Sequence, residues 1–257
     1  MVKKIKAVLI DLSGTLHIEN TVILGAVEAL KRLRQTNAII KFVTNTTKES
    51  KSYLHNRLTQ LGFHINQDEI FSSLAAAREL ILNRNLNPLL LIDTAAMEDF
   101  EDLKKSDSDL NAVVVGLAPE KFHYEELNQA FRLLINGASL VAIHEGRYYK
   151  RSDGLALGPG AFIKGLEYSA GVKALVVGKP KEEFFLAALK NINPQEAIMI
   201  GDDVRDDVAG SQAAGLRGIL VKTGKYREGD ENTISPRPYK TCESFVEAID
   251  SIIEEIH

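Results

Sequence analysis

Hydrophobic runs alternate with amphipathic stretches along most of the chain. Eight short runs are nearly continuous in apolar residues, which is typical of parallel strands covered on both faces. These runs are residues 6–12, 39–45, 88–93, 111–117, 139–144, 173–179, 196–202 and 217–223. Apolar residues recur at helical spacing in residues 26–35, 51–62, 68–83, 124–137, 162–171, 182–192 and 207–216. The alternation predicts an α/β fold with right-handed crossover connections.

Polar side chains stand where four of the predicted strands end. They are Asp11, the pair Thr44 and Asn45, Lys179, and the pair Asp202 and Asp203. In an open parallel sheet the carboxyl ends of the strands form the ligand crevice. We therefore expect these side chains to meet at one edge of a Rossmann-like sheet.

The middle of the chain follows a different pattern. The runs at 111–117 and 139–144 do not end in such polar groups, which indicates a separate insert. We predict a Rossmann-like core made from residues 1–78 and 175–257. A smaller α/β cap, residues 79–174, is predicted to be inserted into it.

Composition narrows the class of protein. The chain has 257 residues, 45% of them hydrophobic, and a formal net charge of -4, so a binding surface for nucleic acid or membrane is not expected. Its one cysteine, Cys242, excludes a disulfide framework and is expected to be a small buried residue. The first apolar run is too short for a signal peptide, and we predict a cytoplasmic protein.

The strand-end residues together suit phosphoryl transfer. An aspartate such as Asp11, followed by a turn at Gly14, can attack phosphorus and form an aspartyl phosphate. Thr44 and Asn45 offer neutral donors to phosphate oxygens, and Lys179 supplies a positive charge. Asp202 offers carboxylate oxygen to a hard cation such as Mg²⁺.

The motifs DLSGT, VTNTT, VGKP and GDDVRDD, in this order, resemble the four motifs of the haloacid dehalogenase-like (HAD) hydrolase superfamily. The long insert after the second motif is similar to that of the subgroup with a C2-type cap, which includes nucleotide, pyridoxal-phosphate and glycerol-phosphate phosphatases. The resemblance spans nearly the whole chain. It implies a Mg²⁺-dependent phosphatase that acts on a small phosphorylated molecule.

The resemblance also implies roles for individual residues. Asp11 would be the nucleophile and a metal ligand. The main-chain carbonyl of Ser13 and the carboxylate of Asp202 would complete the metal ligands, supported by Asp207. Thr44, Asn45 and Lys179 would hold the phosphate.

Ser13 departs from the family pattern, in which an aspartate at this position acts as general acid and base. A serine hydroxyl cannot replace it near neutral pH, and such help is worth about 10²–10⁴-fold in rate. We therefore predict a phosphatase selective for good leaving groups: pyrophosphate, phosphoramidates, and aryl or acyl phosphates. The alternative is a protein that binds phosphorylated ligands without turnover. A response-regulator receiver and a carbon–halogen hydrolase rank below both.

Several further residues have a structural and a functional interpretation. Residues 147–154 form either an ordinary hairpin or a loop of the cap that faces the substrate. We expect His17 to be exposed or to contact the hinge of the cap, and His144 to be structural. Asp203 and Asp206 are expected to be charges at a helix N-terminus. The oligomeric state stays open, with a homodimer as one alternative.

Overall fold

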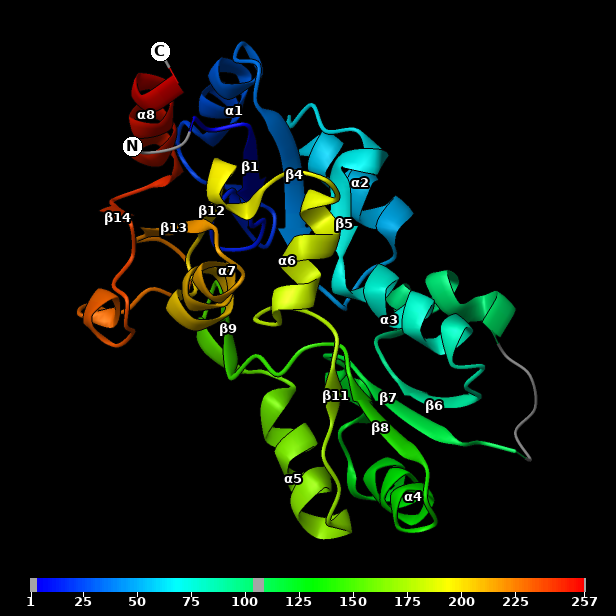
Figure 1. The fold of residues 1–257 in the computed structure, drawn as a ribbon. Coiled ribbons are helices and arrows are strands. Elements are labelled where there is room, and N and C mark those ends of the chain that lie inside the picture. The colour runs from blue at the N-terminus through cyan, green and yellow to red at the C-terminus, as the bar shows by residue number, and fades with distance from the viewer. Residues whose placement is uncertain (1–3, 104–108, 257) are drawn as a thin grey trace.

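The computed structural model of the chain describes residues 4–103 and 109–256 and shows two sheets, each covered by helices (Figure 1). The larger sheet has six parallel strands in the order β14-β13-β12-β1-β4-β5. They are β1 (Ala7–Ile10), β4 (Ile39–Thr44), β5 (Ile70–Ser72), β12 (Ala197–Gly201), β13 (Arg217–Val221) and β14 (Lys240–Cys242). The predicted parallel α/β fold is confirmed.

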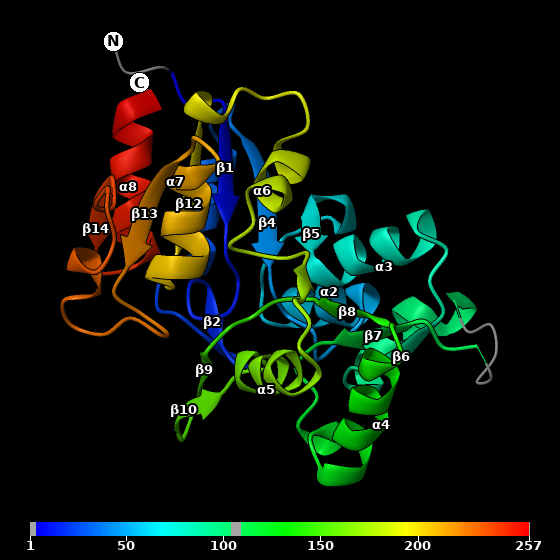
Figure 2. The ribbon, with the colours of Figure 1, turned by 60° about the horizontal axis from the view of Figure 1, so that its bottom comes forward.

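Helices cover both faces of this sheet, as Figure 2 shows. Val8 and Ile10 of β1 point to one face and Ala7 and Leu9 to the other, and all four are fully buried. This explains why strand β1 is apolar at every position instead of alternating. The first face packs on α1 (Ala26–Arg34), α2 (Lys51–Gln60) and α8 (Phe245–Ile256), and the second on α6 (Glu182–Leu189) and the segment around α7 (Gly210–Ala213).

The second sheet has four parallel strands in the order β11-β8-β7-β6. Its strands are β6 (Pro88–Leu91), β7 (Ala112–Val115), β8 (Ser139–Ala142) and β11 (Leu175–Val176). One face packs on α3 (Ser73–Asn83) and the 3₁₀ segment Thr94–Leu103, the other on α4 (Tyr124–Ile135) and α5 (Gly160–Ala170). Strand β11 was predicted within the run 173–179 and assigned to the core, but it pairs with β8 in the second sheet.

Two short hairpins complete the strands. They are β2 (His17–Ile18) with β3 (Thr21–Val22), and β9 (Tyr148–Arg151) with β10 (Gly154–Leu157). The remaining 3₁₀ turns are Gln67–Glu69, Pro119–Lys121, Pro194–Glu196 and Asp230–Asn232, and a π-helical turn, Val204–Ala209, precedes α7. Strand β14 and helix α8, near the end of the chain, were not predicted from the sequence.

Residues 68–83 were predicted as one helix, and this prediction is wrong for the first five residues. A 3₁₀ turn is followed there by β5, which pairs with β4 at the edge of the core sheet. Ile70 and Ser72 both point to the interior and are buried. The apolar residues of this segment are therefore buried by a strand and not, as predicted, by a helix. The Ser72 hydroxyl then accepts a hydrogen bond from the Ala75 N–H at 3.2 Å and caps α3.

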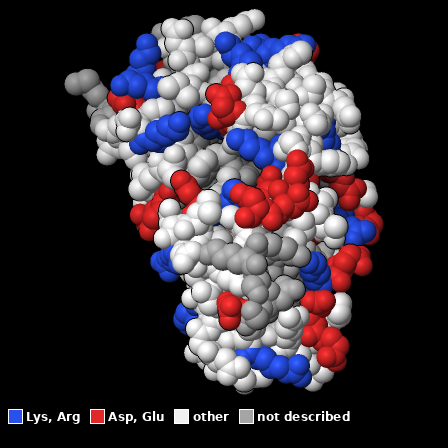
Figure 3. All heavy atoms as spheres, turned by 90° about the vertical axis from the view of Figure 1, so that its right-hand side faces the viewer, with Lys and Arg blue, Asp and Glu red and all other residues white. Residues whose placement is uncertain are grey.

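Helix α1 illustrates how sequence pattern and packing agree. Its buried residues Ala26, Ala29, Leu30 and Leu33 follow the i, i+3, i+4, i+7 spacing of one helix face. On the face in Figure 3, basic and acidic side chains lie among residues of other kinds. None of the helices in residues 4–103 and 109–256 has the length and apolar character needed to cross a bilayer. Cys242 is buried, as expected.

The burial of Phe42 in the core sheet leads to a prediction about stability. Phe42 is fully buried on the α1 and α8 side of β4. We expect Phe42→Ala to lower the free energy of unfolding by about 3–5 kcal/mol, because it removes the ring and leaves a cavity. Tyr168→Ala, at a side chain that is 91% exposed, is the control and should change it by about 0.5 kcal/mol or less. Urea unfolding of both variants measures the difference.

Candidate active site

One buried lysine joins the ends of three segments. Asp11 directly follows β1, and its Oδ1 lies 2.5 Å from the Nζ of Lys179. The same ammonium group donates to Asp207 Oδ1 at 2.6 Å and to the Val43 carbonyl of β4 at 3.2 Å. All three charged side chains are buried. Two carboxylates share one cation, so Lys179 fixes Asp11 against the turn that follows β12.

The Lys179 ammonium is held in its charged form. Burial acts against the charge, but the adjacent Asp11 and Asp207 carboxylates raise the pKa of Lys179 above its usual value. For Asp207, burial is the largest effect, and it raises the pKa to about 6 even though Lys179 acts in the opposite direction. The cluster thus contains more acidic groups than this one lysine neutralises.

Asp202 supplies the third carboxylate. It follows Gly201 at the end of β12, and its Oδ2 accepts the Lys225 backbone N–H at 2.6 Å. Its Oδ1 is buried and has no hydrogen-bond partner within the described residues. Burial raises the pKa of Asp202 well above the usual range, and repulsion from Asp11 adds to this.

The carboxylates of Asp11, Asp202 and Asp207 offer oxygens that all lie within 4.8 Å of one another. Carboxylate oxygen is the ligand that hard divalent cations prefer, and Asp202 Oδ1 accepts no hydrogen bond from the residues that the structure describes. The residues therefore fit a divalent metal ion. Asp207 was predicted only as a supporting acid. Its carboxylate nevertheless belongs to the same group of three as the two predicted carboxylate ligands, Asp11 and Asp202.

Two glycines let the backbone close in on Asp202. Gly14 has φ +96° and Gly224 has φ +55°, conformations that favour glycine. A Cβ atom added to either residue would lie 2.1 Å from Asp202 Oδ2. The turn after β1 and the turn after β13 therefore both pack directly on this carboxylate.

Thr44 and Asn45 were both predicted to bind phosphate, but their side chains make different contacts. Thr44, at the end of β4, is buried, and its hydroxyl accepts the Thr46 N–H at 3.1 Å, which leaves its own O–H to donate into the pocket. Asn45 binds the backbone of Lys179 instead: its Nδ2 donates to the carbonyl at 2.9 Å, and its Oδ1 accepts the N–H at 3.0 Å. The contacts of Asn45 thus position Lys179, whereas a phosphate contact had been predicted.

Ser13 lies on the wall of the same pocket, and its side chain is exposed. The neighbouring Thr15 is buried, and its hydroxyl donates to Asp11 Oδ2 at 3.4 Å. The turn after β1 thus supports Asp11 with a hydroxyl from Thr15, while position 13 supplies no second carboxylate.

Lys225, which follows β13, was not predicted as a site residue. Its Nζ lies 3.2 Å from Asp203 Oδ2, and its side chain is 20% exposed. Burial opposes its charge, but Asp203 and Asp202 raise the pKa of Lys225 above its usual value. Asp203 caps the π-helical turn through the N–H groups of Arg205 and Asp206, as expected for a charge at a helix N-terminus.

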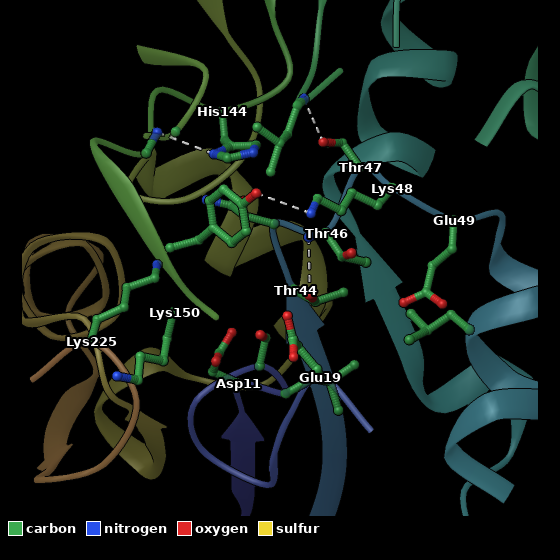
Figure 4. Close-up of a pocket in the computed structure, with 18 of the residues that line it drawn as sticks. Asp11, Glu19, Thr44, Thr46, Thr47, Lys48, Glu49, His144, Lys150 and Lys225 are labelled. Carbon is green, nitrogen blue, oxygen red and sulfur yellow. Dashed lines mark hydrogen bonds between the residues drawn. The ribbon is translucent and has the colours of Figure 1, made fainter. Parts of the chain in front are cut away.

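A pocket of about 410 Å³ opens between the core sheet and the second sheet, and Asp11, Thr44 and Lys179 line it. Figure 4 shows Asp11 and Thr44 on its wall. The hairpin β9–β10 forms part of the opposite wall, so residues 147–154 are both a hairpin and a pocket element. Two contacts tie it to the core. Tyr149 accepts from Lys48 Nζ at 3.2 Å, and Tyr148 accepts from Arg205 at 3.1 Å.

Comparison with known proteins identifies the family. A haloacid dehalogenase-like hydrolase model matches residues 8–104, and a HAD-hydrolase-like model matches residues 176–248. The haloacid dehalogenase-like hydrolase domain-containing protein 2 of Bos taurus is 60% identical over 256 residues, which cover 99% of this chain and 98% of that protein. The chain belongs to the haloacid dehalogenase-like hydrolase family. The predicted resemblance is confirmed.

Two further relatives extend the comparison within this haloacid dehalogenase-like family. The phospholysine phosphohistidine inorganic pyrophosphate phosphatase of Xenopus laevis is 40% identical, over 94% of this chain and 91% of that protein. The p-nitrophenyl phosphatase of Archaeoglobus fulgidus has a similar structure, with a TM-score of 0.86 and 25% identity. The match covers 97% of this chain and 100% of that one, so both sheets share its arrangement.

Two histidines of this haloacid dehalogenase-like hydrolase line the pocket in neutral form. His144, at the end of β8, accepts the Gly146 N–H through Nδ1 at 3.1 Å, and burial, followed by the nearby lysines 225 and 179, lowers its pKa to about 3. His17 was expected to be exposed or to contact the hinge of the cap. It is buried, so the first alternative is wrong, and it donates from Nδ1 to the Glu19 carbonyl at 2.9 Å. Burial, and then Arg57, lowers the pKa of His17 to about 4.

The lowered pKa of His144 leads to a prediction of how the stability of the protein depends on pH. The pKa of His144 in the folded state lies below its ordinary value of 6.5, so the unfolded chain binds more protons between these two values. Its contribution to stability is therefore present above pH 6.5 and is lost as pH falls toward 3. His144→Gln should reduce the slope of unfolding free energy against pH near pH 5 by up to about 1.4 kcal/mol per pH unit.

Urea unfolding between pH 4 and pH 8 provides the measurement. His64→Gln, at an exposed histidine, is the matched control for removing an imidazole. Curves for His144→Gln and wild type that run parallel across this range would contradict the prediction.

Proposed function

We propose that this chain is a Mg²⁺-dependent phosphatase that acts through an aspartyl phosphate on Asp11. The observation that carries the proposal is the buried cluster in which Lys179 contacts Asp11 and Asp207, while one Asp202 oxygen has no hydrogen-bond partner among the described residues. The phosphatase names of the Xenopus and Archaeoglobus proteins support the same reaction class. The proposed substrates are small molecules with good leaving groups.

The chain's own residues divide the reaction into two steps. In the first, an Asp11 carboxylate oxygen forms a bond to phosphorus while the bond from phosphorus to the leaving group breaks, and the leaving group keeps that electron pair. In the second, water attacks the phosphorus, phosphate departs, and the Asp11 carboxylate is restored. The positive charge of Lys179 would stabilise the negative phosphoryl oxygens in both steps, and the hydroxyl of Thr44 would donate to one of them.

The Mg²⁺ ion would be held by Asp11, Asp202 and the main-chain carbonyl of Ser13, with Asp207 close by. When bound, Mg²⁺ neutralises negative charge on the phosphoryl group. The protein residues would orient the phosphate against Asp11, since positioning and electrostatic stabilisation together supply most of the catalysis in phosphoryl transfer.

We further propose that residues 79–174 act as a cap over the pocket. The hairpin β9–β10 reaches the core through Tyr148 and Tyr149, which supports this role. Closure over the pocket would exclude water and select the leaving group. The division into core and cap and the oligomeric state stay predictions.

Asp11→Asn tests the reaction. The amide is a poor nucleophile, so phosphate release from phenyl phosphate and pyrophosphate should fall by a factor on the order of 10³ or more. Addition of a chelator to the wild type should also abolish release, and excess Mg²⁺ should restore it. Thermal unfolding of Asp11→Asn confirms that the variant is folded.

A protein that binds phosphorylated ligands without turnover is the second candidate, and Ser13 is the observation that favours it. Its exposed side chain lies on the pocket wall but supplies no general acid or base. This candidate predicts binding of phosphate compounds with Mg²⁺ and the same slow release from wild type and Asp11→Asn. The assay above therefore decides between the two functions.

The consequence of Ser13 for selectivity has a test of its own. Ser13→Asp supplies a general acid, so turnover of alkyl phosphates should rise by about 10²-fold or more. Pyrophosphate should gain less, because its leaving group departs without a proton. The measurement is kcat for both substrates, and Ser13→Asn is the matched control without an acid. Equal gains on the two substrates would refute this account of selectivity.

A further inference from the structure

His144 is a buried histidine on the pocket wall that the proposed reaction does not use. It stands two residues after β8, is only 8% exposed, and lines the pocket together with Gly146. Figure 4 shows its ring across the pocket from Asp11. Because the phosphoryl group is proposed to lie at Asp11, a polar atom of this ring that faces the pocket would meet the leaving group.

A backbone contact fixes which ring nitrogen of His144 carries a proton. The Gly146 nitrogen lies 3.1 Å from Nδ1, and a backbone N–H can only donate, so Nδ1 is the acceptor. Burial, followed by the positive charges of Lys225 and Lys179, lowers the pKa of His144 to about 3, so the ring is neutral at pH 7. A neutral imidazole has one N–H group. This group is therefore at Nε2, which is a hydrogen-bond donor.

The Nε2–H group of His144 has no acceptor within residues 4–103 and 109–256. The hydrogen bond of its side chain in this part of the chain is made by Nδ1, and Nε2 is not enclosed by the surrounding protein. The Nε2 atom of His17 is, by contrast, enclosed and without a partner among the same residues. A donor at a mostly buried site is costly to leave unpaired, so an acceptor oxygen that enters the pocket would bind there.

The charged groups near His144 bear on what its donor would bind. Lys225 and Lys179 are close enough to lower its pKa, so an ammonium on the leaving group would meet like charges. Asp206 is the nearby carboxylate that would attract an ammonium instead. A Cβ atom added to Gly146 would lie 2.9 Å from His144 Nδ1 and 3.9 Å from Asp206 Oδ2. The two residues thus make opposite demands on a leaving group, an acceptor for His144 and a donor for Asp206.

We propose that His144 is a specificity-determining residue whose Nε2–H donates a hydrogen bond to an oxygen atom of the leaving group. The inference rests on the proposed function, because it takes the scissile phosphoryl group to lie at Asp11. It ranks the good leaving groups named above. A carboxylic leaving group, as in an acyl phosphate, carries an acceptor oxygen next to the bond that breaks. A plain aryl group and an ammonium group do not, so aryl phosphates and phosphoramidates of amines rank below acyl phosphates.

Three stable phosphonates of equal size test this preference by binding, without turnover. 2-Oxopropylphosphonate carries an acceptor oxygen, 2-methylpropylphosphonate has a methyl group in its place, and 2-aminopropylphosphonate has an ammonium. Isothermal titration with Mg²⁺ present should show that the wild type binds the oxo compound at least about fivefold more tightly than either of the others. Equal binding of the oxo and methyl compounds would overturn the proposal. Tightest binding of the amino compound would also overturn it and assign the leaving group to Asp206.

Variants of His144 link the preference to its Nε2–H group. His144→Phe keeps a ring but has no donor, so the preference for the oxo over the methyl compound should fall to about twofold or less. His144→Gln, whose amide can also donate, should keep most of the preference. His64→Phe, at an exposed histidine, is the control and should keep all of it.

Two results with His144→Phe would overturn the proposal. One is an unchanged preference for the oxo compound. The other is an equal loss of affinity for all three phosphonates, which would mean that the imidazole only supports the turn at Gly146. Thermal unfolding of every variant confirms that each is folded.

The failure of this inference differs from the failure of the proposed function. If the wild type releases phosphate from phenyl phosphate faster than Asp11→Asn but His144→Phe keeps the preference, the role of His144 is wrong and the phosphatase stands. If the preference depends on His144 as expected but release equals that of Asp11→Asn, the hydrogen bond from His144 stands and the phosphatase is wrong.

Discussion

A single buried ammonium group, that of Lys179, holds together the parts of the chain that form the pocket. It contacts a carboxylate after β1, a carboxylate in the π-helical turn after β12, and a carbonyl of β4. Removing one partner from a buried ion pair leaves an uncompensated charge, which is strongly destabilising. Asp11, Lys179 and Asp207 are therefore fixed as a unit. The Asn45 side chain adds to this by binding both backbone groups of Lys179.

The path of the chain shows which segment brings Lys179 to the carboxylates of the core sheet. Strand β11 belongs to the second sheet, and Lys179 follows it by three residues. The lysine that neutralises the core carboxylates is thus delivered by the segment that returns from the second sheet. The Tyr148 and Tyr149 contacts of hairpin β9–β10 supply another connection between the same parts. The geometry around Asp11 therefore depends on how the two sheets are joined, as well as on the core sheet itself.

The sequence predicted the parallel α/β fold and the meeting of Asp11, Thr44, Lys179 and Asp202, because apolar runs that end in polar residues carry both signals. It did not show that Lys179 arrives from the second sheet, since a buried strand has the same pattern in either sheet. The burial of His17 and the pairing of Lys225 with Asp203 also escaped prediction, because they depend on contacts between distant segments. For Asp207 the acidic motif was visible, but its nearness to the other two carboxylates is a property of the folded turn.

The close approach of Gly14 and Gly224 to Asp202 has a practical consequence for redesign of the pocket. Neither position has room for a side chain, so a library that diversifies them would consist mostly of misfolded variants. Lys48 and Lys150 line the pocket and form no ion pair with a carboxylate of residues 4–103 or 109–256, so changes there remove no ion pair from this part of the chain. Directed evolution of new substrates should therefore begin at the two lysines and keep both glycines constant.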